Sequence, residues 1–223
     1  MNLLIGKSLS GGSNIKMNNI IEKLTELFQE FPGIGPRQAK RFVYALIEKD
    51  EKFLQSLSFL ISQIKSKIKR CDNCFYVFHN ASENSLNEKK CRFCRDKNRE
   101  NGVIMVLQKE IDLENIEKSG CYNGKYFVLG GIISLLNPEQ VKKIRMRELW
   151  NRVNADKEVN ELVIALNADK EGEATVNYIK QIMDAFVKKR GLKITRFARG
   201  LSSGSEIEYI DKDTIKNAFL NRK

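Results

Sequence analysis

Apolar residues recur at helical spacing through the first third of the chain. They fall every three or four positions in residues 19–30 and again in residues 36–49, which places them on one face of a helix. A third stretch with this spacing covers residues 53–70 and ends in several Lys and Arg residues. The pattern therefore predicts three amphipathic helices, each with one apolar and one polar face.

The pattern changes after residue 100, where short apolar runs alternate with stretches of helical spacing. Runs of this length are typical of buried strands, which we expect at residues 102–108, 125–131, 161–167 and 193–200. The helices are expected around residues 112–118 and 138–153, from ADKEGEA to near Arg190, and from about Asp213 onward. Strands that alternate with helices predict a mostly parallel sheet covered on both faces.

A Pro- and Gly-rich stretch, FPGIGPRQAKR, lies between the first two predicted helices. Pro32 ends the first helix, and Pro36 suits the first turn of the second. Gly33 and Gly35 permit a tight hairpin, so the stretch predicts a helix-hairpin-helix unit. In such a unit backbone N–H groups and a helix N-terminus can approach a phosphate oxygen. The alternative is an ordinary helical turn with a solvated basic face.

Three basic residues follow the hairpin on the first turns of the second helix. They add positive charge where the hairpin would contact a phosphate. Contacts of this kind reach only the DNA backbone, so we expect binding to single- and double-stranded DNA with little sequence preference. The candidate DNA-binding residues are Gly33, Gly35, Arg37, Lys40 and Arg41.

Four cysteines form two CxxC pairs near the middle of the chain. Sixteen residues separate the pair Cys71 and Cys74 from the pair Cys91 and Cys94. Each pair presents two sulfurs to one ion, and the loop lets the pairs converge, so we expect a structural zinc ion with no open position for catalysis. Two disulfides are the alternative, but nothing in the chain resembles a secretory signal. His79, the only histidine, is expected on the surface.

Composition and charge agree with a nucleic-acid partner. Of the 223 residues 42% are hydrophobic, enough for a real core, and the formal charge is +11. Residues 1–100 carry 18 Lys and Arg against 11 Asp and Glu. This excess of positive charge predicts that a polyanion binds the first half of the chain. A merely solvated basic surface would carry the same charge. No apolar run approaches the ~20 residues needed to cross a bilayer, so we expect a soluble, cytoplasmic protein.

These patterns divide the chain into five segments. We expect a flexible tail, a helix-hairpin-helix domain, a zinc module, an α/β domain and a C-terminal tail with a helix. Their expected bounds are residues 1–16, 17–70, 71–100, 101–200 and 201–223. The fold class is therefore α+β and multidomain.

Several motifs resemble the RecR family of recombination mediators. LNADKEGEA resembles the DxDxxGE motif of Toprim domains, and VLGGIISLLNPEQ and ITRFARGLSSGSEIEY look like that family in sequence and order. The glycine hairpin and the paired CxxC units precede them in the same order, so the resemblance covers the chain from Met17. It implies that the α/β segment is a Toprim domain.

The Toprim resemblance also implies a metal site that this sequence has altered. Catalytic Toprim enzymes hold Mg²⁺ with a glutamate after the first strand and two aspartates after a later one. Here Gln108 and Asn167 stand at two of those positions, so we expect little or no phosphoryl transfer. The remaining residues Asp169, Glu171 and Glu173 are expected to form an acidic edge that binds a basic protein partner. An ordinary helix N-terminus stabilised by acidic residues is the alternative.

The resemblance implies a non-enzymatic role in recombinational DNA repair. Proteins of this family assemble into ring-shaped tetramers that clamp DNA, and they act with RecO-like and often RecF-like proteins to load RecA onto SSB-coated single strands. Two other hypotheses remain open at this point. One is an active Mg²⁺-dependent Toprim nuclease or primase-like enzyme that uses Glu110, Asp169 and Glu173. The other is a zinc-stapled RNA-associated protein, which the lack of obvious aromatic stacking motifs disfavours.

Overall fold

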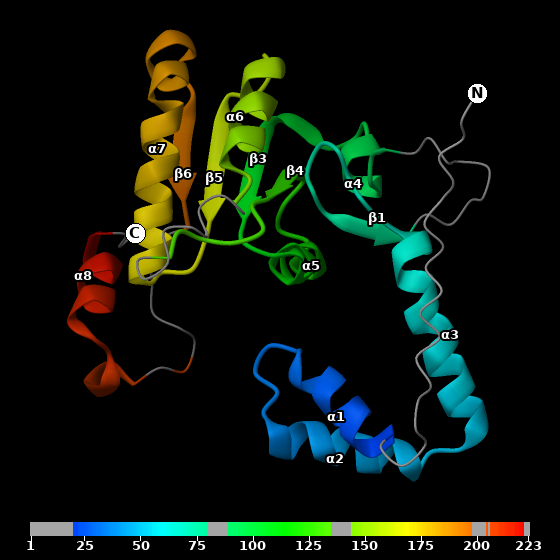
Figure 1. Cartoon of the computed structure of the whole chain (residues 1–223). Coiled ribbons are helices and arrows are strands. Elements are labelled where there is room, and N and C mark those ends of the chain that lie inside the picture. Colours follow the sequence, from blue (N-terminus) through cyan, green and yellow to red (C-terminus); the bar gives the residue numbers. More distant parts are fainter. Residues whose placement is uncertain (1–19, 80–88, 135–143, 198–203, 205, 221–223) are drawn as a thin grey trace, which may run out of the picture. The chain divides into compact units, whose positions relative to one another are not determined.

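The computed structural model of the chain contains two units, residues 1–64 and residues 65–223. The structure describes residues 20–79, 89–134, 144–197, 204 and 206–220 (Figure 1). The expected tail of residues 1–16 lies outside the described residues.

Three helices make up the described part of the first unit. They are α1 (Ile20–Gln29), α2 (Pro36–Ile47) and α3 (Glu51–Lys67), the last of which continues into the second unit. Ala39 and Val43 on α2 are buried, and the ring of Phe28 lies 5.7 Å from that of Phe42. The helices predicted from the apolar spacing are confirmed, and α1 packs on α2 through this small apolar face.

The turn between α1 and α2 uses its two glycines differently. Gly33 has φ +80°, a left-handed conformation that glycine adopts without strain. The amide of Ile34 donates to the carbonyl of Phe31 at 3.1 Å, which closes the turn. Gly35 has an ordinary φ of −84° and is the N-cap of α2, with Pro36 in the first turn. Only the first of the two positions therefore requires glycine for its backbone angle.

The third helix ends three residues earlier than its apolar spacing suggests. α3 stops at Lys67, and Ile68–Arg70 form strand β1 rather than the last turn of the helix. β1 pairs antiparallel with β2 (Val77–His79), with Ile68 opposite His79. The pairing closes the turn that carries the first two cysteines, and the Cys71 amide donates to the Tyr76 carbonyl at 2.9 Å. This tertiary pairing overrides the helical periodicity, because Ile68 also fits the apolar stripe.

A four-stranded parallel sheet forms the centre of the second unit. Its order is β4-β3-β5-β6, and all three neighbouring pairs are parallel. The strands are β3 (Glu100–Leu107), β4 (Gly124–Val128), β5 (Glu161–Ala165) and β6 (Lys193–Arg196). The four predicted strands and the parallel arrangement are confirmed, and the α+β fold class with them. Residues 198–200 of the last predicted strand lie outside the described residues.

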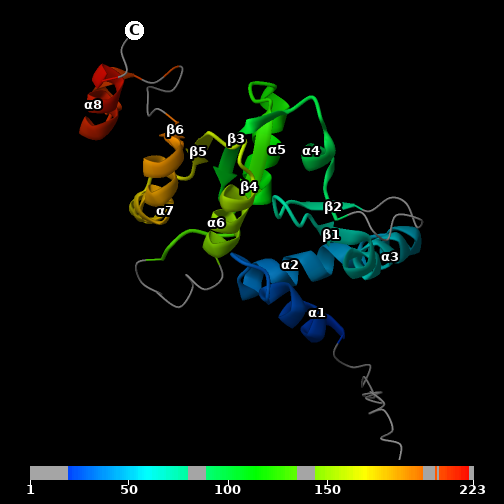
Figure 2. The same cartoon turned by 90° about the horizontal axis from the view of Figure 1, so that it is seen from above.

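Helices cover both faces of this sheet. They are α5 (Glu110–Ser119), α6 (Met146–Ala155) and α7 (Lys170–Arg190). Figure 2 shows α6 and α7 on one face and α5 on the other. The helix predicted at 138–153 begins at Met146, since Ile144 and Arg145 are not helical and residues 138–143 lie outside the described part.

Side chains from alternate positions of the strands pack into two separate apolar clusters. On the α6–α7 face, Ile104 and Val106 pack with Leu149 and Ile179. On the α5 face, Met105 and Leu107 pack with Leu113, three of the cysteines and Phe93. Because successive strand residues point to opposite faces, one strand supplies both clusters. The cysteine module is therefore part of the core on the α5 face.

The remaining described elements are short. They are α4 (Arg92–Arg95), the 3₁₀ turn η3 (Ile207–Tyr209) and α8 (Lys212–Leu220). The predicted C-terminal helix is thus confirmed at α8. Among the described residues, none of the helices has the length and apolar character needed to span a bilayer.

Candidate functional site

The four cysteines converge on one point. Their sulfur atoms all lie within 4.8 Å of one another, and the sulfurs of Cys74 and Cys91 are 3.4 Å apart. Cys71, Cys74 and Cys91 are buried and Cys94 is partly buried. The predicted set of four is therefore brought together, and it could hold a metal ion.

Local backbone structure aims the sulfurs at this point. After β1, the Phe75 amide donates to the Cys71 carbonyl at 2.9 Å, and Phe75 has φ 62°, so the chain turns sharply around the first pair. The second pair flanks the start of α4, where the Cys94 amide donates to the Cys91 carbonyl at 3.1 Å. The Cys91 amide donates to the sulfur of Cys71 at 3.3 Å, which links the two pairs directly.

The charge state of the thiols favours a cation at the centre. Contact with Cys74 lowers the pKa of the Cys71 thiol, whereas the same contact raises the pKa of the Cys74 thiol. Contact with Cys71 and burial also raise the pKa of Cys94. Four close, buried sulfurs cannot all be thiolates by themselves, because their negative charges would repel in a poorly solvated site. A divalent cation would stabilise all four thiolates together.

Polar contacts fasten the cysteine module to the sheet. The Val128 amide at the end of β4 donates to the Cys74 carbonyl at 2.8 Å. Lys125, only 5% exposed, donates from its Nζ to the carbonyls of Phe93 at 3.2 Å and Asp96 at 2.5 Å. The ammonium therefore ties β4 to the end of α4. Sequence reasoning missed Lys125, although a lysine inside the apolar run KYFVL is a visible sign of a buried contact.

A second buried cation supports the same junction. The Arg99 guanidinium donates to both carboxylate oxygens of Glu117, at 2.8 and 2.6 Å, and lies over the ring of Phe93 at 5.0 Å. The hydroxyl of Tyr126 donates to Glu117 as well. Burial and the adjacent Glu117 raise the pKa of Tyr126, so this hydroxyl stays protonated as a donor. Together these groups hold α5, β4 and the cysteine module in one arrangement.

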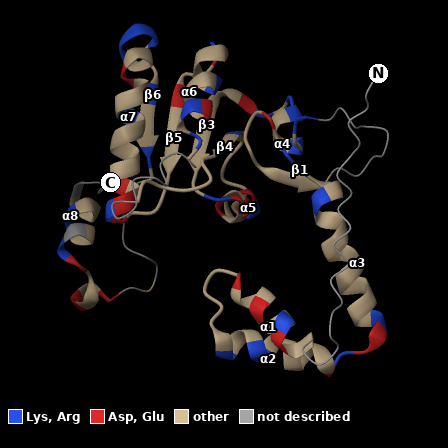
Figure 3. Ribbon diagram, viewed as in Figure 1, with Lys and Arg blue, Asp and Glu red and all other residues tan. Residues whose placement is uncertain are grey.

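The candidate DNA-binding residues gather at the start of α2. Gly33 and Gly35 form the turn, and Arg37, Lys40 and Arg41 are exposed while Ala39 faces α1. The first turn of α2 contains no acidic residue, and Gly35 has no side chain to cap its amides. Figure 3 shows the basic residues along α2. The structure thus brings the five residues of the prediction onto one exposed end of the helix; their role in DNA binding stays a prediction.

The altered acidic motif lies at the carboxyl ends of neighbouring strands. β3 and β5 pair directly, so Gln108 and Asn167 follow them at the same edge of the sheet. Asp169 is the N-cap of α7, and its Oδ1 accepts from the Gly172 amide at 2.7 Å. A Cβ on Gly172 would lie 2.0 Å from the Asn167 carbonyl oxygen, so this close turn needs glycine. The loop from Asn167 to Gly172 therefore forms the capped N-terminus of α7.

The other acids of this edge also have protein partners. Both carboxylate oxygens of Glu173 accept from Arg196, at 2.8 and 2.9 Å, and Glu110 lies 3.5 Å from the Arg70 guanidinium. In the part of the chain that is described, the cysteines are the only cluster of three or more possible ligands within reach of one ion. Docking of a basic partner by Asp169, Glu171 and Glu173 stays a prediction.

Together these features define a class of multidomain proteins that join a helix-hairpin-helix unit, a four-cysteine module and a Toprim domain. The Toprim domain model matches residues 102–198, "RecR, helix-hairpin-helix" matches residues 21–65, and "RecR, C-terminal" matches residues 200–223. The chain belongs to the RecR family, as its curated relatives also show.

Three of these relatives illustrate the extent of the similarity. Recombination protein RecR of Lactobacillus johnsonii is 34% identical over 202 residues, covering 91% of this chain and 96% of the relative. The Streptomyces coelicolor protein of the same name is 33% identical over 204 residues, covering 92% and 96%. The Myxococcus xanthus protein is 33% identical over 207 residues, covering 93% and 96%.

Two substitutions of Asp169 separate its capping contact from its charge. Asp169→Ala should lower the free energy of unfolding by about 1 kcal/mol, because the Gly172 amide loses its acceptor. Asp169→Asn keeps a capping oxygen and should unfold close to the unmodified protein. Thermal or urea unfolding followed by circular dichroism measures both. Equal stability of all three proteins would show that the cap contributes nothing.

Proposed function

We propose that this chain is a non-enzymatic DNA-binding recombination mediator. In this role it would act as a clamp that helps load a RecA-type recombinase onto SSB-coated single strands, together with RecO-like and often RecF-like proteins. Membership of the RecR family supports the recombination role, since its relatives are named recombination proteins. The observation that carries the DNA-binding part is the exposed basic hairpin at the start of α2.

The geometry of the hairpin suits a phosphate. The first N–H groups of an α-helix lack intrahelical partners, and the helix dipole adds partial positive charge at the same end. Gly33 and Gly35 have open space where a Cβ would be, so a phosphate oxygen can approach the backbone there. Arg37, Lys40 and Arg41 stand around this end. Contacts of this kind recognise any DNA sequence.

The acidic residues of the Toprim domain already contact other protein groups, which supports the absence of catalysis. Mg²⁺ is usually bound through one or two carboxylates together with waters and substrate phosphates, and the amides at Gln108 and Asn167 supply no carboxylate. Asp169 caps α7, while Glu110 and Glu173 are paired with arginines. An active site built from these three acids would have to break those contacts before it could hold the ion.

We also assign zinc to the four cysteines. Four thiolates are the usual set for tetrahedral structural Zn²⁺, and such a site keeps no position for a reacting water. The cluster lies within the core on the α5 face of the sheet. The ion would thus stabilise the second unit and take no part in chemistry.

The exposed apolar residues of α3 support self-association. Phe59, Leu60, Ile61 and Ile64 are each more than half exposed, which is unusual for four large apolar side chains on one short stretch. A second copy of the chain would bury them. We propose that α3 takes part in the subunit contacts of a tetrameric ring.

Neutral substitutions in the hairpin should weaken DNA binding in a salt-dependent way. Arg37→Gln with Arg41→Gln removes two phosphate contacts, so the slope of log affinity against log salt on duplex DNA should shrink by about 2. Fluorescence anisotropy across a salt series measures it. Lys180→Gln with Lys189→Gln removes the same charge from exposed positions of α7 and should change little. An unchanged slope in the hairpin variant would remove this surface from the DNA site.

The same DNA, recovered after incubation with Mg²⁺, tests the absence of catalysis. Strands should return intact on a denaturing gel. Cut or extended strands that disappear with Asp169→Ala would instead support a Toprim enzyme.

Metal analysis tests the zinc assignment. Purified protein should contain about one zinc ion per chain, and Cys74→Ala or Cys91→Ala should lose it and unfold at lower temperature. Cys121→Ala is the matched control, because Cys121 is exposed and far from the cluster in sequence. Full zinc content in the Cys74 or Cys91 variants, or another metal in the purified protein, would contradict the assignment.

Charged substitutions on α3 test the self-association. Light scattering should give a mass near four times the 25.7 kDa chain, and Leu60→Glu with Ile64→Glu should produce smaller species. Ile111→Glu places one acid at an exposed apolar site of α5 and should leave the mass unchanged. A tetramer that survives the double substitution would exclude the α3 face from the contact.

A further inference from the structure

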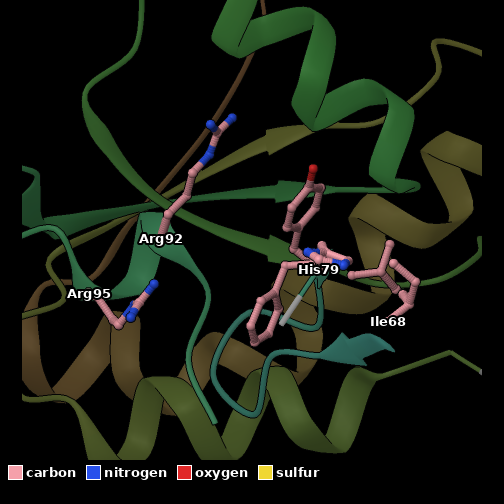
Figure 4. Close-up of a pocket in the computed structure, with 7 residues that line it drawn as sticks. Ile68, His79, Arg92 and Arg95 are labelled. Carbon is pink, nitrogen blue, oxygen red and sulfur yellow. The ribbon is translucent and has the colours of Figure 1, made fainter. Parts of the chain in front are cut away.

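The cysteine module contains a pocket that the metal site does not use. The pocket has a volume of about 390 Å³ and is lined by β1, β2, the residues just before β2, and α4. In Figure 4, Arg92 and Arg95 extend from α4, and Ile68 and His79 come from the two strands of the hairpin. All of these residues belong to the second unit. The pocket is therefore a feature of the module alone.

The lining of this pocket favours an anion. Two arginines and His79 line it, together with apolar and aromatic residues, and none of the described residues that line it is an Asp or Glu. A neighbouring pocket shares Tyr76 and Arg92 and is also lined by Glu114 and Glu117, so these acids of α5 line that second pocket. A phosphate has three or more acceptor oxygens, and the parallel N–H donors of a guanidinium group match two of them.

The residues around the pocket also carry positive charge, which favours an anion over a wider surface. The described residues of the module, 65–79 and 89–97, contain nine Lys and Arg against two Asp and no Glu. Figure 3 shows this positive charge on α4 and at the end of α3. A strand of nucleic acid is attracted to a surface of this kind over several nucleotides.

Aromatic residues give the pocket a second type of contact. Tyr76 and Phe78 line it and are only partly buried. Tyr76 is held in place, because its hydroxyl donates to Glu114 at 3.3 Å and its ring packs edge-on to Phe93 at 5.4 Å. Ring faces beside arginines bind unpaired bases by stacking, whereas the faces of paired bases are hidden inside a duplex.

The pocket is also held in shape before any ligand arrives. Arg92 lies over the Phe93 ring at 4.6 Å, and the hairpin residues on the other side are fixed by the β1–β2 pairing. Both sides are joined through the cysteine cluster, since Cys71 follows β1 and Cys91 precedes α4. Ligand binding therefore costs little conformational entropy, because the protein groups that contact the ligand are already ordered.

We propose that this pocket binds one nucleotide of single-stranded DNA, with its phosphate on Arg92 and Arg95 and its base against Phe78 or Tyr76. The inference rests on the proposed DNA-binding function and adds a site outside the α1–α2 hairpin. The hairpin contacts any DNA backbone, whereas the pocket selects an unpaired base. Preference for single strands would then come from the cysteine module.

Substitutions in the pocket test the site. Arg92→Gln with Arg95→Gln should weaken binding of a fluorescent oligo(dT) about tenfold, with a smaller loss on a duplex of the same length. Phe78→Leu should weaken the single strand and leave the duplex unchanged. Lys180→Gln with Lys189→Gln again removes equal charge elsewhere. If pocket variants with full metal content bind oligo(dT) within about twofold of the unmodified protein, the proposal is wrong.

Cross-linking of the unmodified protein gives an answer that does not depend on variant folding. Oligonucleotides with 5-iodouracil form adducts on irradiation with aromatic side chains that stack on the base. Mass spectrometry should locate adducts at Tyr76 or Phe78, and adducts confined to other segments would overturn the site. A failure of the proposed DNA-binding function would be distinguishable from a failure of the pocket proposal. In that case the unmodified protein would bind neither oligo(dT) nor the duplex at low salt.

Discussion

The convergence of four sulfur atoms is the contact on which the second unit depends most. Cys71 and Cys74 lie at the β1–β2 turn and Cys91 and Cys94 at α4, so the cluster joins two segments that are separate in the sequence. The same buried group includes Leu107 of the sheet and Leu113 of α5. An ion at this point would therefore stabilise one whole face of the sheet as well as a small loop module. This explains why Lys125 and Arg99 are also placed at the junction, where they satisfy carbonyls and a carboxylate that burial would otherwise leave without partners.

At the carboxyl edge of the sheet, acidic residues serve the fold. A Toprim metal site would need its acids free to point at one ion, but Asp169 accepts from the Gly172 amide and Glu173 binds Arg196. The tight approach of Gly172 to the Asn167 carbonyl fixes the loop in the form that capping requires. Replacement of two metal-binding acids by Gln108 and Asn167 removes the charge that would oppose this arrangement. At this edge the Asp169 side chain stabilises the start of α7.

Much of the architecture could be predicted from the sequence because it depends on local pattern. Strand runs such as residues 102–108 and the paired CxxC spacing need only periodicity and ligand chemistry. The β1–β2 pairing could not be predicted in this way, since Ile68 fits a helical stripe and the competing strand partner lies nine residues or more away. Lys125 and Arg99 depend on carbonyls and carboxylates supplied by other elements, so their burial follows only from the assembled fold. The hairpin at Gly33 belongs with the features that local sequence can predict, because its positive φ follows from the geometry of the turn.

The distribution of charge suits the proposed role, in which the protein binds DNA without sequence preference. A single hairpin with Arg37, Lys40 and Arg41 would make few phosphate contacts, and salt would weaken each of them. Affinity then has to come from several weak contacts on one chain or on several copies, because linked sites raise each other's effective concentration. The basic cysteine module offers a second set, and its rigidity comes from the buried sulfurs rather than from a large core of its own. If both proposals hold, metal binding and DNA binding are coupled, because an ion at the cysteines would also fix the arginines of α4 in the positions from which they would contact a strand.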